Sequence, residues 1–282
     1  MPIRSDTPRK KPRLAVLAVI AAFVASLAFA APALATARPE TGGKGGPKPT
    51  IVLVHGAFAD ASGWSDVIER LQREGHTVYA PANPLRGTTT DSDYLRAFLG
   101  TIPGPIVLVG HSYGGAVITN AATGNRNVKA LVYIAAFALD QGETVQGANA
   151  LGGGETQVVN HLVTRPFPGA TEGDQDAYID PAWFHRLFAQ DLPKKQAAVM
   201  AASQRPAALA SLVIPSGVPA WKTIPSWYMV AANDNIIPPA AERFMAKRAK
   251  AKTVEVKSSH VPMMSQPKKV TDLILSAVKG RR

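Results

Sequence analysis

Ser112 is the residue of this sequence best suited to act as a nucleophile. It lies at the centre of a Gly-x-Ser-x-Gly pattern at residues 110–114, which carries little information by itself. Here the pattern directly follows an apolar run at residues 106–109 and opens a helix-forming stretch. A strand, a tight turn and a helix in this order expose a serine hydroxyl on a strained turn. We therefore predict a nucleophilic serine in preference to a turn with a capping serine.

A serine hydroxyl needs a base to take its proton, and His260 is the histidine best placed to do so. It follows a predicted strand at residues 253–256 after a short loop, which puts it at the carboxyl edge of a parallel sheet. His111 is predicted to point behind the serine turn. The other histidines of the chain lie outside this edge or in its first loop, namely His55, His76, His161 and His185.

The imidazole of a general base needs a carboxylate to orient it, and Asp234 comes directly after a predicted strand at residues 227–231. The chain order Ser112, Asp234, His260 is the order expected for a serine nucleophile on a sheet of this kind. Asp140, with Glu143 behind it, follows the fourth predicted strand. It is the alternative acid, or else a turn residue at a hinge.

An oxyanion formed by attack on a carbonyl needs two backbone N–H donors. The first is predicted to be Tyr113, because it follows the nucleophile. The second is predicted to be Ala57, in the loop that follows the first strand. His55 in the same loop is expected to brace it.

Alternating strands and helices must hold these residues in place. Apolar runs predict strands at residues 51–54, 77–80, 106–109, 128–137, 227–231 and 253–256. Helical periodicity lies between most of them, which predicts an α/β fold with a doubly wound, mostly parallel sheet of about six strands. The alternation stops at about residues 138–223, and this stretch is predicted to form a helical lid over the carboxyl ends of the strands.

The amino-terminal segment has the pattern of an export signal. A basic start and an apolar stretch at residues 14–30 precede the small residues Ala33 and Ala35, so we predict a signal peptide at residues 1–35. The alternative is a retained membrane anchor. Residues 36–49 are rich in Gly, Pro and Lys and predict a flexible linker, which leaves a domain at residues 50–282. The expected location is therefore secreted or periplasmic, with membrane contact only through the signal segment.

The composition bears on partners and cofactors. The chain carries a net charge of +11, but its basic runs are not interleaved with aromatic residues, so nucleic-acid binding has little support. Cysteine is absent, which excludes disulfides, a thiol nucleophile and thiolate metal sites. The expected partner is a small-molecule ester, and no metal or organic cofactor is implied. The pattern leaves the oligomeric state open.

With these motifs in place, the chain from Thr50 onward resembles the α/β-hydrolase superfamily. The likeness is greatest to the compact branch that includes plant methyl-ester esterases and hydroxynitrile lyases. The matching segments are residues 55–57 with Trp64, 110–115, 233–238 and 259–263. Hydroxynitrile lyases of this branch place a threonine and a lysine where this chain has Gly56 and Val261, so the resemblance implies the esterase side.

The resemblance implies a serine hydrolase that cleaves a carboxylic ester through an acyl-enzyme. Three alternatives stay open. The same three catalytic residues would also serve a cofactor-free haloperoxidase, or a hydrolase of lactones or amides. The scaffold could instead be a ligand-binding protein with little turnover.

Overall fold

The computed structural model describes residues 47–171 and 173–280. The predicted signal at residues 1–35 and most of the predicted linker lie outside the described residues. Among the helices in the described ranges, none is both long and apolar enough to cross a membrane.

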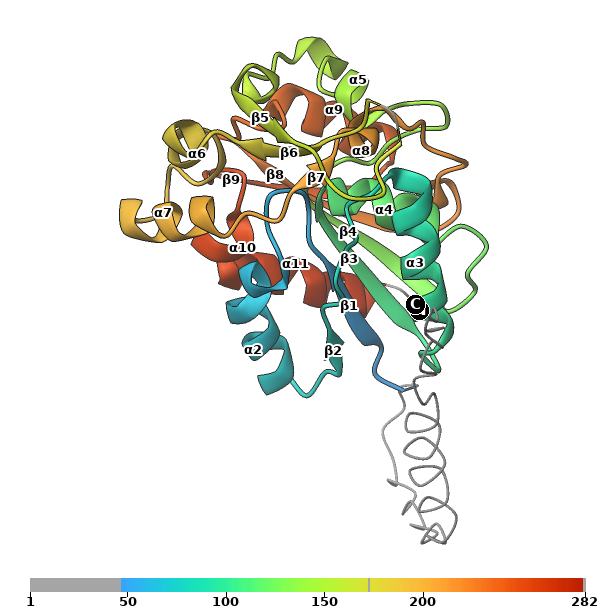
Figure 1. Cartoon of the computed structure of the whole chain (residues 1–282). Coiled ribbons are helices and arrows are strands. Elements are labelled where there is room, and N and C mark those ends of the chain that lie inside the picture. The colour runs from blue at the N-terminus through green and yellow to red at the C-terminus, as the bar shows by residue number, and fades with distance from the viewer. Residues whose placement is uncertain (1–46, 172, 281–282) are drawn as a thin grey trace, which may run out of the picture. The chain divides into compact units, whose positions relative to one another are not determined.

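A six-stranded parallel sheet forms the centre of the domain (Figure 1). Its order is β2-β1-β3-β4-β8-β9, which confirms the predicted fold. The strands in that order span Val78–Tyr79, Thr50–Val54, Ile106–Ser112, Val128–Ala136, Ser226–Ala231 and Lys252–Val256. The central strands β3, β4 and β8 are almost entirely buried, because helices cover both faces of the sheet. This burial explains their uninterrupted apolar runs.

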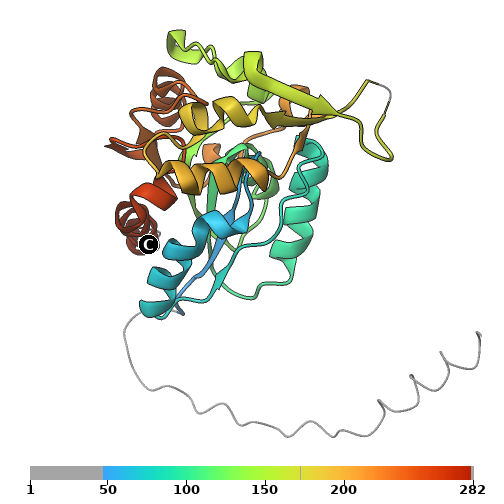
Figure 2. The same cartoon turned by 60° about the vertical axis from the view of Figure 1, so that its left-hand side comes forward.

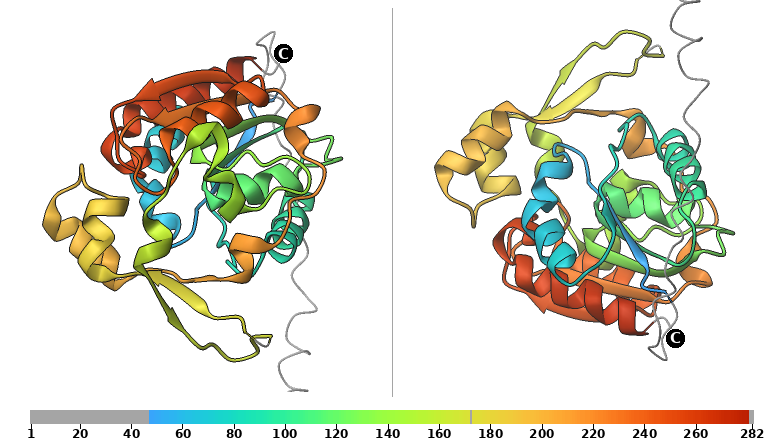
Figure 3. Two further views of the ribbon diagram at one scale, coloured as in Figure 1. Left: turned by 90° about the horizontal axis from the view of Figure 1, so that it is seen from above. Right: turned by 90° about the horizontal axis from the view of Figure 1, so that it is seen from below.

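Helices cover the sheet in two layers (Figure 3). On one face α2 (Ser65–Arg73) packs against α11 (Pro267–Gly280), and on the other α3 (Thr88–Gly100) packs against α4 (Tyr113–Ala121). A short 3-10 helix, η2 (Ala61–Trp64), precedes α2. The helices α9 (Pro239–Arg248) and α10 (Pro262–Ser265) follow β8 and β9 respectively. Because all strands are parallel, their carboxyl ends meet at one edge, where the loops that carry the candidate residues lie together.

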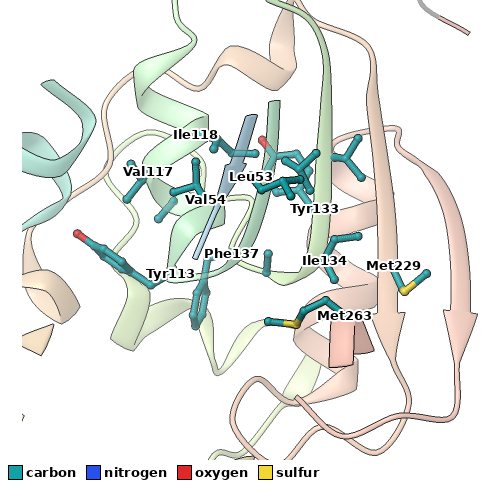
Figure 4. Packing of buried hydrophobic residues seen from close by; sticks show 14 of the residues in the cluster. Leu53, Val54, Tyr113, Val117, Ile118, Tyr133, Ile134, Phe137, Met229 and Met263 are labelled. Carbon is teal, nitrogen blue, oxygen red and sulfur yellow. The ribbon is translucent and has the colours of Figure 1, made fainter. Parts of the chain in front are cut away.

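The apolar core fills the space between the sheet and its helices (Figure 4). Leu53 of β1, Ile134 of β4 and Met229 of β8 are fully buried in it. From the helices, Val117 and Ile118 of α4 join the same cluster. This packing fixes the strands that the site loops extend from.

The segment between β4 and β8 is the lid, and it lies over the carboxyl ends of the strands (Figure 1). Its two longest helices are α6 (Pro181–Phe188) and α7 (Lys194–Ala202), in agreement with the predicted helical lid. Its shorter pieces are α5 (Val145–Ala148), η3 (Leu151–Gly153), η4 (Val158–His161), α8 (Ala210–Val213) and η5 (Ala220–Lys222).

The lid also holds a feature that the sequence analysis missed, a three-stranded antiparallel sheet in the order β5-β6-β7. Its strands span Leu162–Arg165, Asp176–Ile179 and Ala207–Ala208. Strands of only two to four residues are too short to show a period-two alternation in the sequence. The β5–β6 hairpin extends outward from the lid (Figure 2).

Candidate active site

Ser112 lies where strand β3 passes directly into helix α4. Its backbone has φ 54° and ψ −125°, in the left-handed half of φ that a residue with a Cβ seldom adopts. The chain accepts this strain because the buried strand before it and the buried helix after it are both fixed. The result is a side chain that projects from the carboxyl edge of the sheet.

Two glycines allow other backbone segments to approach this turn closely. A Cβ on Gly114 would lie 2.5 Å from the carbonyl oxygen of Val54 in β1. A Cβ on Gly56, in the loop after β1, would lie 2.6 Å from the Cβ of Ser112. Neither position tolerates a side chain without a backbone shift, so glycine is what brings the first loop against the serine.

His260 contacts the serine through one ring nitrogen and an aspartate through the other. Its Nε2 lies 2.8 Å from Ser112 Oγ, and its Nδ1 lies 2.5 Å from Oδ2 of Asp234. Because a carboxylate only accepts hydrogen bonds, Nδ1 carries the proton and Nε2 is free to accept the one from Ser112. His260 is fully buried, so water does not compete for these contacts.

Asp234 lies in the loop after β8 and is held by its own backbone neighbours. Its Oδ1 accepts the N–H groups of Ile236 at 2.6 Å and Ile237 at 3.0 Å, which leaves Oδ2 for His260. The structure thus brings the three residues Ser112, His260 and Asp234 together in one line of hydrogen bonds.

Asp140, the alternative acid, lies elsewhere. Its carboxylate pairs with Lys222 Nζ at 2.6 Å, at the base of the lid. Glu143 pairs with Arg248. Neither carboxylate hydrogen-bonds to a histidine of the described residues. Asp140 is therefore a turn residue at the hinge of the lid, the alternative to a catalytic acid, and Glu143 lies at the same hinge.

The two candidate oxyanion donors, Ala57 and Tyr113, both lie beside Ser112 in the wall of one cavity. Among the described residues, neither backbone N–H donates to a protein acceptor. Buried N–H groups are rarely left without a partner, so two free donors next to a nucleophile form a binding site for a negatively charged oxygen, which would accept from both.

The Tyr113 side chain is fixed by Asp91, a contact that the sequence analysis did not anticipate. Its hydroxyl donates to Oδ2 of Asp91 at 2.7 Å. The same carboxylate accepts the N–H of Arg86. Burial raises the pKa of Asp91, in spite of these hydrogen bonds. Asp91, which lies in the first turn of α3, therefore anchors the first residue of α4.

Glu242 is another buried carboxyl near the site, and it was not predicted from the sequence. It lies in the first turn of α9, fully buried, and its Oε2 accepts the N–H of Ala231 at 3.1 Å. Burial, and then the charge of Asp234, raise its pKa well above the ordinary value. An acidic residue in a first helical turn is ordinarily a solvated one, so the sequence contains no signal for this burial.

Two other histidines brace the site. His55 accepts the N–H of Asn83 at its Nε2, 3.0 Å away, and its Nδ1 donates to the Gly56 carbonyl at 2.9 Å. His111 Nε2 donates to the backbone carbonyl of His260 at 2.7 Å. Burial lowers the pKa of both imidazoles, so they are neutral supports. The predicted bracing role of His55 agrees with these contacts.

A cavity opens over Ser112, between the sheet edge and the lid. It encloses about 490 Å³ of space not occupied by atoms, solvent at its mouth included. Among the residues that the structure describes, none with a charged side chain lines it. The lining residues are Ala57, Phe58, Ser112, Tyr113, Phe137, Val145, Gln146, Asn149, Val158, Val159, Leu162, Leu212 and Ile236. Within residues 47–171 and 173–280, no group of three or more His, Asp or Glu side chains could hold a metal ion.

The chain is similar in sequence to known hydrolases. Residues 51–273 match the model of the Alpha/beta hydrolase family. A carbendazim hydrolyzing esterase from a Nocardioides species is 34% identical over 108 residues, which are 34% of this chain and 45% of that protein. A pyrethroid hydrolase from Sphingobium wenxiniae is 27% identical over 246 residues, 79% of this chain and 85% of its own length.

Among solved structures, polyneuridine aldehyde esterase superposes with a TM-score of 0.70 at 21% sequence identity. The match covers 82% of this chain and 99% of that one. At this level of identity the likeness establishes a shared fold.

Proposed function

The chain belongs to the alpha/beta hydrolase family, and we propose that it cleaves carboxylic esters through an acyl-enzyme formed on Ser112. The observation that carries this proposal is the continuous line of hydrogen bonds from Ser112 through His260 to Asp234. A buried serine hydroxyl that faces an unprotonated imidazole nitrogen has a general base in place to remove its proton, which makes the oxygen a nucleophile.

In the proposed reaction, His260 Nε2 takes the Ser112 proton as Oγ attacks the ester carbonyl carbon. The backbone N–H groups of Ala57 and Tyr113 stabilise the oxyanion. His260 then gives the proton to the leaving alcohol, and Asp234 stabilises the imidazolium and keeps its orientation. Water, activated by the same imidazole, releases the acid and regenerates the serine.

The cavity supports an uncharged, largely apolar substrate. Burying an unpaired charge against this lining would be costly, because no side chain of opposite charge is present to compensate it. Gln146 and Asn149 are the amide side chains of the wall. Asn149 donates its Nδ2 to the Val145 carbonyl, and its Oδ1 has no partner among the described residues. Two of the matched relatives are named as an esterase and as a pyrethroid hydrolase, which agrees with small uncharged substrates.

Replacement of the nucleophile tests the proposal. We expect Ser112→Ala to lower the turnover of p-nitrophenyl esters by about 10³–10⁶-fold, because the acyl-enzyme can no longer form. A fluorophosphonate probe should label the wild type at Ser112 and leave the variant unlabelled, while circular dichroism shows both folded. An undiminished esterase rate in the variant would end the proposal, and ligand binding without labelling of the wild type would favour the binding-protein alternative.

We also propose that the protein is exported and that residues 1–35 are removed. The support is the basic start, the apolar stretch and the small residues Ala33 and Ala35. The lack of cysteine is compatible with an oxidising location, since no free thiol is exposed to it.

A further inference from the structure

The loop between α6 and α7 connects the lid to both of the loops that carry the candidate catalytic acid and base. The Nε2 of Gln190 donates to the carbonyl of Asn233 at 2.5 Å, directly before Asp234. The Nδ2 of Asn235, directly after it, donates to the carbonyl of Arg186 at 3.0 Å. The Asp234 loop is therefore attached to the lid on both sides of the aspartate.

Asp191 makes the corresponding contact to the histidine loop. Its Oδ2 accepts the backbone N–H of Ser259 at 2.9 Å, one residue before His260. Ser259 is fully buried. Burial acts to raise the pKa of Asp191, but hydrogen bonds from Ser259, and from Ser265 and Ser258, outweigh it and lower the pKa, so the carboxylate stays ionised. An ionised acceptor makes the contact to the N–H group stronger than a neutral one would.

The imidazole itself is enclosed between the lid and the core. Phe188, the last residue of α6, places its ring 5.0 Å from the His260 ring in an edge arrangement. On the core side, His111 donates to the His260 carbonyl. The residue before His260 is thus held by the lid and the carbonyl of His260 by the core, which leaves the ring little freedom to leave Ser112.

We propose that Asp191 is a positioning residue, which acts through the Ser259 backbone to hold His260 against Ser112 and makes turnover depend on a docked lid. The inference rests on the proposed function, because it assigns Asp191 to the same serine site. An error of about 1 Å in the placement of a catalytic group can lower the rate by about 10²-fold, so one lost backbone anchor is enough to matter.

The test compares Asp191→Ala with Asp191→Asn and with a matched change in the lid, Asp180→Ala. Asp180 caps α6 by accepting the N–H of Ala182 at 2.9 Å, and no hydrogen bond to a catalytic loop involves its side chain. The readouts are kcat and KM for a p-nitrophenyl ester, the rate constant for fluorophosphonate labelling of Ser112, and the thermal midpoint.

For Asp191→Ala we expect kcat and the labelling rate to fall together by about 10–100-fold, with KM changed less than about threefold. Asp191→Asn should recover part of the loss, because its amide oxygen still accepts from Ser259. Asp180→Ala should keep kcat within about twofold of the wild type, even if its thermal midpoint falls as much as that of Asp191→Ala. If Asp191→Ala fails to fold, Asp191→Ser provides the same comparison. The serine side chain is polar but one bond shorter than that of aspartate, so its oxygen does not reach the N–H of Ser259.

Wild-type kcat and labelling in a folded Asp191→Ala would overturn the role of Asp191. An equal loss in Asp180→Ala would do the same, because the effect would then be a general one on lid stability. Failure of the proposed function looks different: the wild type would not be labelled, or Ser112→Ala would stay active, and the role of Asp191 would be overturned with it.

Discussion

At the scale of single residues, the two buried carboxyl groups that lie close to the end of β8, Asp234 and Glu242, have different tasks. Asp234 accepts from His260, whereas Glu242 accepts from Ala231 at the start of the same loop. Burial disfavours a negative charge on Glu242, and the charge of Asp234 beside it would repel a second one. The raised pKa of Glu242 follows from both causes, so the folded protein keeps this carboxyl uncharged at pH values where an ordinary glutamate is already ionised.

This assignment predicts how stability depends on pH. The folded state holds a proton on Glu242 in the pH range above the ordinary glutamate pKa of 4.5, where the unfolded chain has lost it. The folded state then binds more protons, so the contribution of Glu242 to stability decreases as the pH rises through this range. The Glu242→Gln variant has no titratable group at this position, so it does not lose stability in this way. We expect its thermal midpoint to rise relative to the wild type between pH 5 and pH 8.

Thermal unfolding at several pH values measures this difference. Glu69→Gln makes the same change in net charge at an exposed position of α2 and should show no widening difference. A difference between wild type and Glu242→Gln that stayed constant with pH would show that Glu242 is ionised when folded.

At the scale of elements, helix α9 anchors the base of the lid. Arg248 in its last turn donates to Glu143 through Nη1 and Nη2, and Nη2 also donates to the Ala138 carbonyl at 3.1 Å. Both side chains of the pair are less than a quarter exposed. Burial acts to raise the pKa of Glu143, but the hydrogen bonds and charge of Arg248 outweigh it and lower the pKa.

We expect Arg248→Met to lower the free energy of unfolding by about 1.5–3 kcal/mol, because it leaves a partly buried carboxylate with the backbone N–H of Asp140 but without its two charged donors. Because the pKa of Glu143 is lower in the folded protein than in the unfolded chain, this stabilisation is present above the ordinary glutamate pKa. It is lost as the pH falls through the pKa of Glu143 in the folded protein. The deficit of the variant should therefore be largest near neutral pH and shrink below about pH 4.

Urea denaturation at pH 7 and pH 3.5 measures this deficit. Arg243→Met on the same helix is the matched control, because its pair with Glu255 is about half exposed and should contribute less than about 1 kcal/mol. Equal losses in the two variants would contradict an anchoring role for Arg248.

At the scale of the whole molecule, the lid and the sheet depend on one another. Arg86, in the loop after β2, pairs with Asp176 of the lid strand β6 at 2.5 Å. Asp191 and Gln190 join the lid to the loops of the candidate acid and base. The cavity wall combines residues of both parts. Substrate preference is therefore a property of the assembled domain, which a screen of esters by chain length would map.

The proposal of export yields a prediction for the full chain. Produced with its first 35 residues in a bacterial host, the protein should be recovered outside the cytoplasm with Thr36 as its first residue, because the Ala33 and Ala35 pattern precedes that bond. Intact-mass measurement identifies the cut. Ala35→Arg should block it and leave the longer chain in the membrane fraction. Recovery of an uncut wild-type chain in that fraction would support the retained anchor.

The sequence by itself was enough to predict the parallel sheet and the candidate residues Ser112, Asp234 and His260. A strand, a turn and a helix are local patterns, so residues 106–121 predict the serine turn without knowledge of the rest. Parallel strands end at one edge, so a histidine and an aspartate just after two strands are predicted to meet there.

Only the tertiary structure identified Asp91, Asp191 and Glu242, and it also chose between Asp234 and Asp140. These carboxyl groups act through partners far away in the sequence: Tyr113 for Asp91, Ser259 for Asp191 and Ala231 for Glu242. In a sequence they look like ordinary solvated acids, because charge is normally placed on the surface. The contacts that they make depend on how the helices and the lid pack, and that packing is a sum of many long-range contacts which no local pattern records.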